Sequence, residues 1–241
     1  MSWRPDVAWA YLADSPILWL SVTVLCYLGA LLLYRRCGSH PLLLPVLTAV
    51  VIVVALLMLT KTPYPVYAES TQLLTFLIGP ATVALAVPLY GQLGRLKQVW
   101  LPVCVALLAG SLTAILSALG IGWLLNGSSQ TLLSLAPKSA TMPIAMEVAQ
   151  LTGGLPSFTT VAVAITGITG AIMAGSLLKL FRINDPAVEG FALGLCAHAI
   201  GTARAFQRNE TAGAFAALAM SLNGIATAVL VPVVLALLGF L

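Results

Sequence analysis

The stretch VWLPVCVALLAGSLTAILSALGIGWLL, residues 99–125, decides the class of fold, because it runs for 27 residues without a charged side chain. The hydrocarbon core of a bilayer is about 30 Å thick, so about 20 apolar residues in a helix cross it. Backbone inside hydrocarbon must satisfy its own polar groups, which leaves helices or closed barrels as the spanning structures. Unbroken apolar runs of this length therefore predict helices rather than the short alternating strands of a barrel.

The composition of the whole chain agrees with a membrane protein. Of the 241 residues, 60% are hydrophobic and only 7% are charged, whereas soluble domains carry about 25% charged residues. The net charge of +4 comes from eleven basic residues scattered between the apolar runs. They form no stripe, so we expect a lipid bilayer as the main partner and no nucleic acid.

Apolar runs bounded by charge, proline or polar loops predict five continuous spans. Besides 99–125, these are residues 16–34, 41–60, 158–178 and 211–240. Three more segments are apolar but interrupted by glycine or proline, and we interpret them as broken or re-entrant helices: 70–90, 131–151 and 187–205. The prediction is an all-α fold, a polytopic membrane helical bundle of about seven or eight crossing or re-entrant segments in a single domain, residues 1–241. An inverted-repeat, transporter-like arrangement is left open.

Basic residues in short loops predict the topology, because such loops lie on the cytoplasmic side. Three loops carry them: Arg35 with Arg36, Arg95 with Lys97, and Lys179 with Arg182. The last loop shares the side of the others only if segment 131–151 does not cross fully. The pattern therefore predicts a re-entrant hairpin over 131–157, in a multi-pass protein of the cell inner (cytoplasmic) membrane.

Four ionisable side chains lie inside apolar segments, and each is a functional hypothesis, because a charge in hydrocarbon costs several kcal/mol unless it is paired or wetted. They are Lys138, Glu147, His198 and Arg204. All four belong to interrupted segments, where unwound backbone can offer free N–H and C=O groups to a ligand.

The two cationic side chains among these residues could bind an anionic ligand. Arg204 follows Gly201 and Thr202, and its guanidinium can bind a carboxylate through two parallel hydrogen bonds; the alternative is an arginine that reaches the membrane surface. Lys138 follows Pro137, so a half-helix N-terminus and a cation could face the same anion. Its alternative is a loop lysine at the surface.

The other two ionisable residues suit proton transfer. His198 could carry a coupled proton, since imidazole titrates near pH 6.5, or it could be a packing residue. Glu147 could share that proton or form a structural ion pair with Lys138 or Arg204. The small residues Gly190 with Gly194, and Gly170 with Gly175, predict only close helix packing.

Other classes of function find no support in the sequence. It contains no HExxH, P-loop or GxSxG motif, so we do not expect an enzyme. The four cysteines show no metal-ligand spacing, and we expect no metal and no cofactor: Cys26, Cys37, Cys104 and Cys196. A channel would favour polar rings over isolated charges.

Three motifs resemble the signatures of the LrgB/CidB family, and the match covers most of the chain. They are GPATVALAVPLYGQ (79–92), LAPKSATMPIAMEV (135–148) and GLCAHAIGTARAF (194–206). The resemblance is strongest to YohK-like inner membrane proteins of bacteria, and the core also resembles the membrane domain of the plastidic glycolate/glycerate translocator. One departure concerns coupling, because family members often carry an acid at the position occupied here by Gln207.

The resemblance implies a transporter of small monocarboxylates such as glycolate, glycerate, pyruvate or lactate, working by alternating access, with proton coupling left open. It equally implies an alternative, an antiholin-like regulator of murein hydrolase export and cell lysis that acts with a small LrgA/CidA-like membrane protein. We also expect a homodimer.

For the transporter, we expect Arg204 and Lys138 to hold the carboxylate and His198 or Glu147 to carry any proton. Hydroxyl groups would bind the rest of the substrate: Thr82, Ser139, Thr141 and Thr202.

Overall fold

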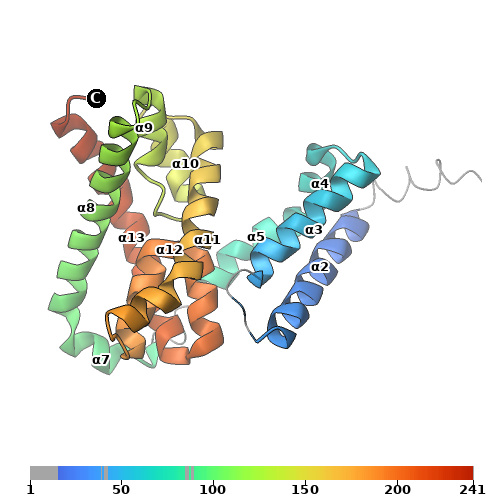
Figure 1. Ribbon diagram of the computed structural model, residues 1–241, viewed down its shortest axis with the longest axis horizontal. Coiled ribbons are helices and arrows are strands. Elements are labelled where there is room, and N and C mark those ends of the chain that lie inside the picture. Colours follow the sequence, from blue (N-terminus) through green and yellow to red (C-terminus); the bar gives the residue numbers. More distant parts are fainter. Residues whose placement is uncertain (1–15, 39, 41–42, 85–86, 88–89, 241) are drawn as a thin grey trace, which may run out of the picture. The chain divides into compact units, whose positions relative to one another are not determined.

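The computed structural model describes residues 16–240 except 39, 41–42, 85–86 and 88–89. Across this part of the chain it forms eleven helices (Figure 1). Four helices in the described residues are long and apolar enough to cross a membrane: Ile17–Arg36, Trp100–Leu124, Pro156–Leu180 and Glu210–Leu237. The chain is therefore a polytopic helical membrane protein. It divides into two compact units, Met1–Ala84 and Leu85–Leu241.

The first unit contains α2 (Pro16–Arg36), α3 (Pro45–Thr60), α4 (Tyr64–Ser70) and α5 (Gln72–Ala84). Helix α2 matches the predicted span 16–34. The span predicted over 41–60 was too long, because α3 begins only at Pro45, and the described Leu44 before it is extended (φ −47°, ψ 127°), as a residue before proline prefers. Its 16 residues reach only about 24 Å.

The interruption of 70–90 was predicted at Gly79-Pro80 and at Pro88, and Pro88 lies outside the described residues. Helix α5 continues through Gly79 and Pro80 to Ala84. The break comes instead at Thr71, which separates α4 from α5. Its hydroxyl donates a hydrogen bond to the carbonyl of Tyr67 at 2.9 Å, and such side-chain bonds compete with the helical backbone.

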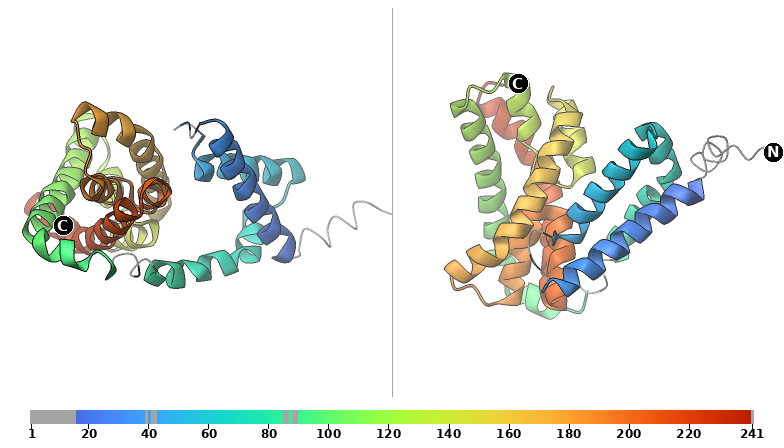
Figure 2. Two further views of the ribbon diagram at one scale, coloured as in Figure 1. Left: turned by 90° about the horizontal axis from the view of Figure 1, so that it is seen from below. Right: turned by 45° about the vertical axis from the view of Figure 1, so that its right-hand side comes forward.

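The second unit is built on three long helices. Its elements are α7 (Leu93–Gln98), α8 (Trp100–Leu124), α9 (Ser129–Leu135), α10 (Met142–Leu151), α11 (Pro156–Leu180), α12 (Pro186–Arg208) and α13 (Glu210–Leu237). Helices α8, α11 and α13 match the three spans predicted in this region, and α12 and α13 lie between α8 and α11 (Figures 1 and 2). Helices α9 and α10 gather at one end of the unit, and α7 and α12 lie toward the other (Figure 1).

The loops before α8 and after α11 meet at one end of this unit. Nη2 of Arg95 lies 2.6 Å from Oδ2 and 2.7 Å from Oδ1 of Asp185. We name this the basic end, because it also carries Lys97, Lys179 and Arg182. Two of the three loops predicted to share a side of the membrane therefore do share an end of the unit.

Helices α9 and α10 form a hairpin that returns to the opposite end. The backbone N–H of Leu155, just after α10, donates to Oγ of Ser134 in α9 at 2.7 Å, and Thr159 donates to the Ser134 carbonyl at 2.9 Å. Residues 136–141 make the turn, and Thr141 is extended (φ −64°, ψ 149°) before α10 begins. This is the geometry of the hairpin predicted over 131–157.

Helix α12 is also a hairpin, broken at His198, whose backbone is not helical (φ 39°, ψ −128°). A Cβ on Gly201 would lie 2.3 Å from the carbonyl oxygen of Leu193, although residues eight apart in a continuous helix are separated by about 12 Å. Arg208, at the end of the second arm, pairs with Glu189 at the start of the first. The segment predicted to be broken over 187–205 thus enters from the basic end and returns to it.

Glycines let the first arm of α12 pack directly on α13. A Cβ added to Gly190 or Gly194 would lie 2.0 Å from the carbonyl oxygen of Ala212 or Ala216. This confirms the close packing predicted for that pair. Gly170 likewise packs against Ala197, but nothing lies within 4 Å of a Cβ on Gly175, so the prediction was wrong there.

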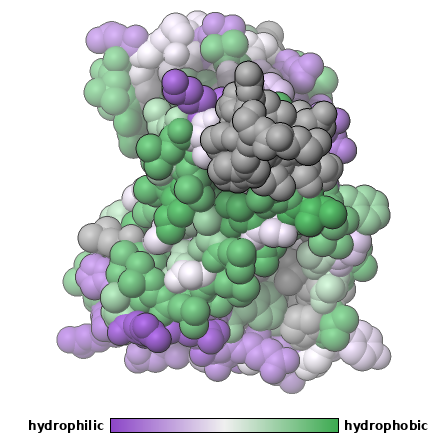
Figure 3. Space-filling view, turned by 90° about the vertical axis from the view of Figure 1, so that its right-hand side faces the viewer, coloured by the Kyte–Doolittle hydropathy of each residue, from purple (hydrophilic) through white to green (hydrophobic). Residues whose placement is uncertain are grey.

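The outward faces of the long helices are apolar. Large side chains are exposed on α8, α11 and α13, as Leu108, Val161 and Ile225 illustrate. Figure 3 shows the side that lies at the right of Figure 1, and there hydrophobic side chains gather across the middle while hydrophilic ones lie toward the upper and lower edges. In water such a surface would drive aggregation, whereas lipid accommodates it.

Candidate functional site

The turns of the two hairpins meet at one buried amide in the middle of the second unit. Asn223, at the centre of α13, is 1% exposed. Its Nδ2 donates to the carbonyls of Ser139 in the first turn at 2.8 Å and Leu195 in the second hairpin at 3.3 Å. Ser111, at the centre of α8, donates to its Oδ1 at 2.7 Å. One side chain therefore ties both turns to two long helices.

The first turn brings a cation to this place. Nζ of Lys138 donates to Oγ of the buried Ser139 at 3.3 Å. Thr141 is half-buried just before α10, and its side chain makes no capping hydrogen bond. The structure thus places Lys138 and Ser139 in the turn that Asn223 joins to the second hairpin.

His198 makes the second turn and fastens it to α11. Its side chain is 4% exposed, and Nε2 lies 3.0 Å from the carbonyl oxygen of Val163. Because a carbonyl only accepts, Nε2 carries the hydrogen. The ring lies against Gly167, where an added Cβ would come within 2.5 Å of Cε1. A positive φ is strained for histidine, and such strain concentrates at functional sites.

Arg204 lies on the second arm of the α12 hairpin and is 8% exposed. Its Nε and Nη1 are buried and have no hydrogen-bond partner among the described residues. Two exposed arginines differ, since Arg95 and Arg208 each have a carboxylate partner. A buried guanidinium with free N–H groups is a strong anion binder, because an anion replaces the water it has lost.

The remaining predicted residues contribute less directly. Thr202 donates its hydroxyl to the His198 carbonyl at 2.8 Å and contacts Sδ of Met220 at 3.7 Å, which leaves its oxygen as an acceptor. Glu147 is exposed on α10, and within the described part of the chain it forms no salt bridge with Lys138 or Arg204. The structural ion pair considered for Glu147 is therefore absent there.

Gln207, which occupies the position where family members often carry an acid, is exposed on the last turn of α12. One residue of the predicted set remains. Thr82 belongs to α5 in the first unit, and its side chain lies outside the described residues. Its predicted role stays a prediction.

Both return arms begin at the turns, so two helix N-termini point toward the same region. Helix α10 begins at Met142, and the second arm of α12 follows His198. The first N–H groups of a helix lack partners within it and carry a partial positive charge. Lys138 lies in the first of these turns, whereas Arg204 lies six residues beyond His198 along the second arm of α12.

Asn223 and Ser111 were missed by reasoning that considered only ionisable residues. A signal was present, because an asparagine at the centre of a long apolar span is itself unusual and polar side chains there join helices. Its partners could not be named from the sequence, since both acceptors are backbone carbonyls.

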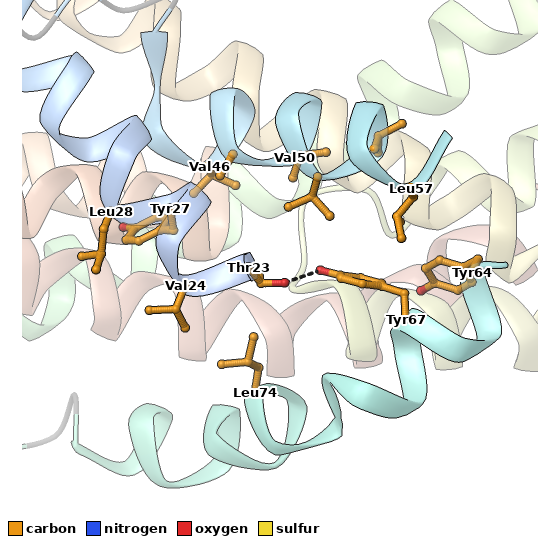
Figure 4. A pocket seen from close by; sticks show the side chains of 13 residues that line it. Thr23, Val24, Tyr27, Leu28, Val46, Val50, Leu57, Tyr64, Tyr67 and Leu74 are labelled. Atoms are coloured by element: carbon orange, nitrogen blue, oxygen red, sulfur yellow. Dashed lines mark hydrogen bonds between the residues drawn. The ribbon is translucent and has the colours of Figure 1, made fainter. Parts of the chain in front are cut away.

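A cavity in the first unit offers no comparable chemistry. It has a volume of about 510 Å³ and lies among α2, α3, α4 and α5. The hydroxyl groups of Thr23 and Tyr67 are 3.1 Å apart at its side, and aliphatic side chains make most of its wall (Figure 4). Among the described residues that line it, none is charged.

These features define a polytopic helical membrane protein in which the buried Asn223 joins two hairpins. Residues 23–237 match the LrgB-like family, and the chain belongs to that family. It is 36% identical over 216 residues to the uncharacterized protein YwbG of Bacillus subtilis (strain 168), covering 90% of this chain and 96% of that protein. The uncharacterized protein YxaC of the same organism is 36% identical over 206 residues, 86% of this chain and 89% of that protein.

A further relative carries a functional name. The antiholin-like protein LrgB of Bacillus cereus (strain B4264) is 27% identical over 225 residues, which cover 93% of this chain and 98% of that protein. No solved structure matches the chain. The family match runs through both compact units, and the expectation of a single domain stays a prediction.

Proposed function

We propose that this protein is a multi-pass inner-membrane transporter of small monocarboxylates, with glycolate, glycerate, pyruvate and lactate as the candidate substrates. The observation that supports this proposal best is the buried Arg204, whose Nε and Nη1 have no partner among the described residues. A carboxylate accepts charge-assisted hydrogen bonds from such N–H groups, and its two oxygens match the parallel pair Nε–H and Nη2–H of a guanidinium.

Energetics favour a ligand there over a purely structural arginine. A buried charge with no partner destabilises a fold by several kcal/mol. Two charge-assisted hydrogen bonds from a carboxylate contribute about 1.5–3 kcal/mol each. Lys138 and the two helix N-termini would add long-range attraction, and the hydroxyls of Ser139, Thr141 and Thr202 would bind the substituents. His198, with its Nε2 hydrogen occupied, would accept a coupled proton at Nδ1, or Glu147 would carry it.

The arrangement of the hairpins suits alternating access. One hairpin enters from the basic end, the other enters from the opposite end, and they meet at Asn223. We interpret the order long helix, hairpin, long helix, hairpin as an inverted repeat with re-entrant hairpins. Motion of one hairpin and its neighbours against the other would expose the site to each side in turn.

The alternative function is antiholin-like regulation of murein hydrolase export and lysis, with a small LrgA/CidA-like partner. The name of the Bacillus cereus relative favours it. Under this alternative, the protein, as a monomer or a homodimer, acts by contact with its partner. Arg204→Ala then leaves regulation largely intact.

Uptake into proteoliposomes tests the proposal. Each of the four labelled acids is offered to the wild type, Arg204→Ala and Arg204→Lys, with and without a pH gradient. Arg208→Ala is the matched control, because Arg208 lies on the same arm but is exposed and paired with Glu189.

We expect saturable uptake that Arg208→Ala retains. Loss of two charge-assisted bonds, about 3 kcal/mol or more, lowers uptake efficiency by at least about 100-fold in Arg204→Ala. Arg204→Lys rescues poorly, because an ammonium cannot bind a carboxylate through two parallel bonds. Absence of uptake for all four acids, in protein that regulates lysis normally, favours the antiholin-like function, and non-saturating flux indicates a channel.

A further inference from the structure

A groove of about 360 Å³ runs between α8 and the first arm of α12, apart from the residues of the candidate site. Arg95 and Asp185 lie at its outer part, at the basic end. Its walls are apolar, and Phe215 of α13 contributes to them. Arg95 also lies over the Phe215 ring, with Cζ 5.7 Å from the ring centroid. The groove thus begins at charged side chains and continues between apolar ones.

The groove extends along α12 to the hairpin turn. Its lining includes Ala187 near the start of the first arm and Cys196 near its end, which are about 14 Å apart along a helix. The inner part reaches the candidate site through Leu195, which is also in the lining and accepts a hydrogen bond from Asn223. Cys196 lies two residues before His198, where the hairpin turns.

We propose that this groove is the passage by which a small monocarboxylate travels between the basic end and the site at the hairpin turns. The identity of the solute rests on the proposed function. Apolar walls with a few placed charges are the usual lining of small-molecule sites. Arg95 attracts the anion at the mouth, where Asp185 competes for the same guanidinium. The apolar walls offer the carboxylate no ion pair, so it crosses the groove wetted by water and is next bound at Lys138 in the turn.

Cys196 provides a native reporter at the inner part of the groove. The experiment uses the full chain with Cys26, Cys37 and Cys104 replaced by serine, in inside-out and right-side-out vesicles. The probe is a membrane-impermeant anionic thiosulfonate. A second variant keeps Cys104 alone, because that thiol is exposed on α8 and does not line the groove.

We expect the anionic probe to modify Cys196 from the face that carries Arg95 and from no other, and to leave Cys104 unmodified. A saturating transported carboxylate slows the modification. Arg95→Gln lowers the rate for the anionic probe by about 10-fold relative to a cationic probe of similar size, since a charge at the mouth raises the local anion concentration. Lys179→Gln, at the same end but outside the lining, changes the ratio less.

A pair of tryptophan variants identifies the route. Cys196 also lines a smaller cavity of about 220 Å³ between α11 and α12. Ala106 lines only the groove, and Ala174 lines only the smaller cavity. Ala106→Trp should therefore protect Cys196, and Ala174→Trp should not; the reverse pattern overturns the proposal.

The remaining outcomes separate this proposal from the proposed function. Modification of Cys196 by a lipid-soluble maleimide alone shows a lipid-filled groove and refutes the passage, whether or not uptake occurs. Modification by the anionic probe, blocked by Ala106→Trp, supports the passage even if none of the four acids is transported, and in that case the proposed solute is wrong.

Discussion

Replacing Asn223 by leucine should destabilise the protein and disable the site together. The substitution keeps a similar volume but removes three hydrogen bonds, from Ser111 and to the carbonyls of Ser139 and Leu195. Hydrogen bonds between membrane helices average about 0.6 kcal/mol, which gives about 2 kcal/mol for three. The groups left unpaired in the buried site raise the loss toward about 4 kcal/mol.

Reversible unfolding in mixed micelles measures this loss. Thr227→Val is the matched control, since Thr227 lies one turn further along α13 and is buried to the same degree, 2% against 1% for Asn223. It should cost less than about 1 kcal/mol, because it removes no hydrogen bond between helices in the described part of the chain.

Asn223→Leu should also alter uptake by the fraction of the protein that remains folded. Asn223 sets the distance between the two turns, so the leucine variant raises KM for the carboxylate as well as lowering the maximal rate. Asn223→Gln keeps the amide, so its KM should lie between that of Asn223→Leu and the wild-type value. If Asn223→Leu unfolds like Thr227→Val and keeps the wild-type KM, the role assigned to Asn223 is refuted.

Three more predictions follow from the packing and the charges. Gly194→Ala should prevent stable folding, because its Cβ would lie 2.0 Å from a backbone carbonyl of α13; the yield of monodisperse protein measures this. Gly120→Ala is the control, since no described atom lies within 4 Å of its added Cβ, and it should stabilise the protein by up to about 1 kcal/mol. Arg204→Met should raise the thermal stability of the ligand-free protein by about 1–3 kcal/mol, because it removes unpaired buried N–H groups, and should abolish stabilisation by carboxylates; a less stable variant contradicts the ligand role. The N–H of Ala187 and the guanidinium of Arg95 hold the pKa of Asp185 below its ordinary value of 3.8. The contribution of Asp185 to folding stability is therefore complete above this ordinary value and is lost as the pH falls through the lowered pKa. On acidification below about pH 4, Asp185→Asn should therefore lose less stability than the wild type, by under about 1 kcal/mol at this exposed site. Thermal unfolding at several pH values measures this, and equal dependence of stability on pH in the two proteins would contradict it.

Much of the fold could be predicted because its signals are local. The apolar runs of α8, α11 and α13 had the length that a bilayer demands, and proline and glycine marked segments that could not continue. The basic loops predicted that 131–157 returns to its own side, and the hairpin of α9 and α10 has that geometry. The error at α3 has a local cause too, since proline suits the first position of a helix and Pro45 begins α3. Pro80 is different, because α5 continues through it in the helix interior.

The candidate site could be predicted only in part. The sequence identified the ionisable residues of the apolar segments, because a charge in hydrocarbon is costly unless it is paired or wetted. They are Lys138, Glu147, His198 and Arg204. Their partners were not visible. The exposed position of Glu147 and the contact of His198 with the Val163 carbonyl depend on how distant helices pack.

The sequence by itself determined that this is an all-helical membrane protein of the LrgB-like family with interrupted segments that carry charge, because hydropathy and helix breaking depend on residues close together in the chain. Only the tertiary structure decided which arginine is unpaired. Arg95 and Arg208 have partners 90 and 19 residues away, whereas Arg204 has none among the described residues. Likewise, only the fold joined the two turns at Asn223, because a hydrogen bond to a backbone carbonyl depends on position in space and leaves no mark in the identity of the accepting residue.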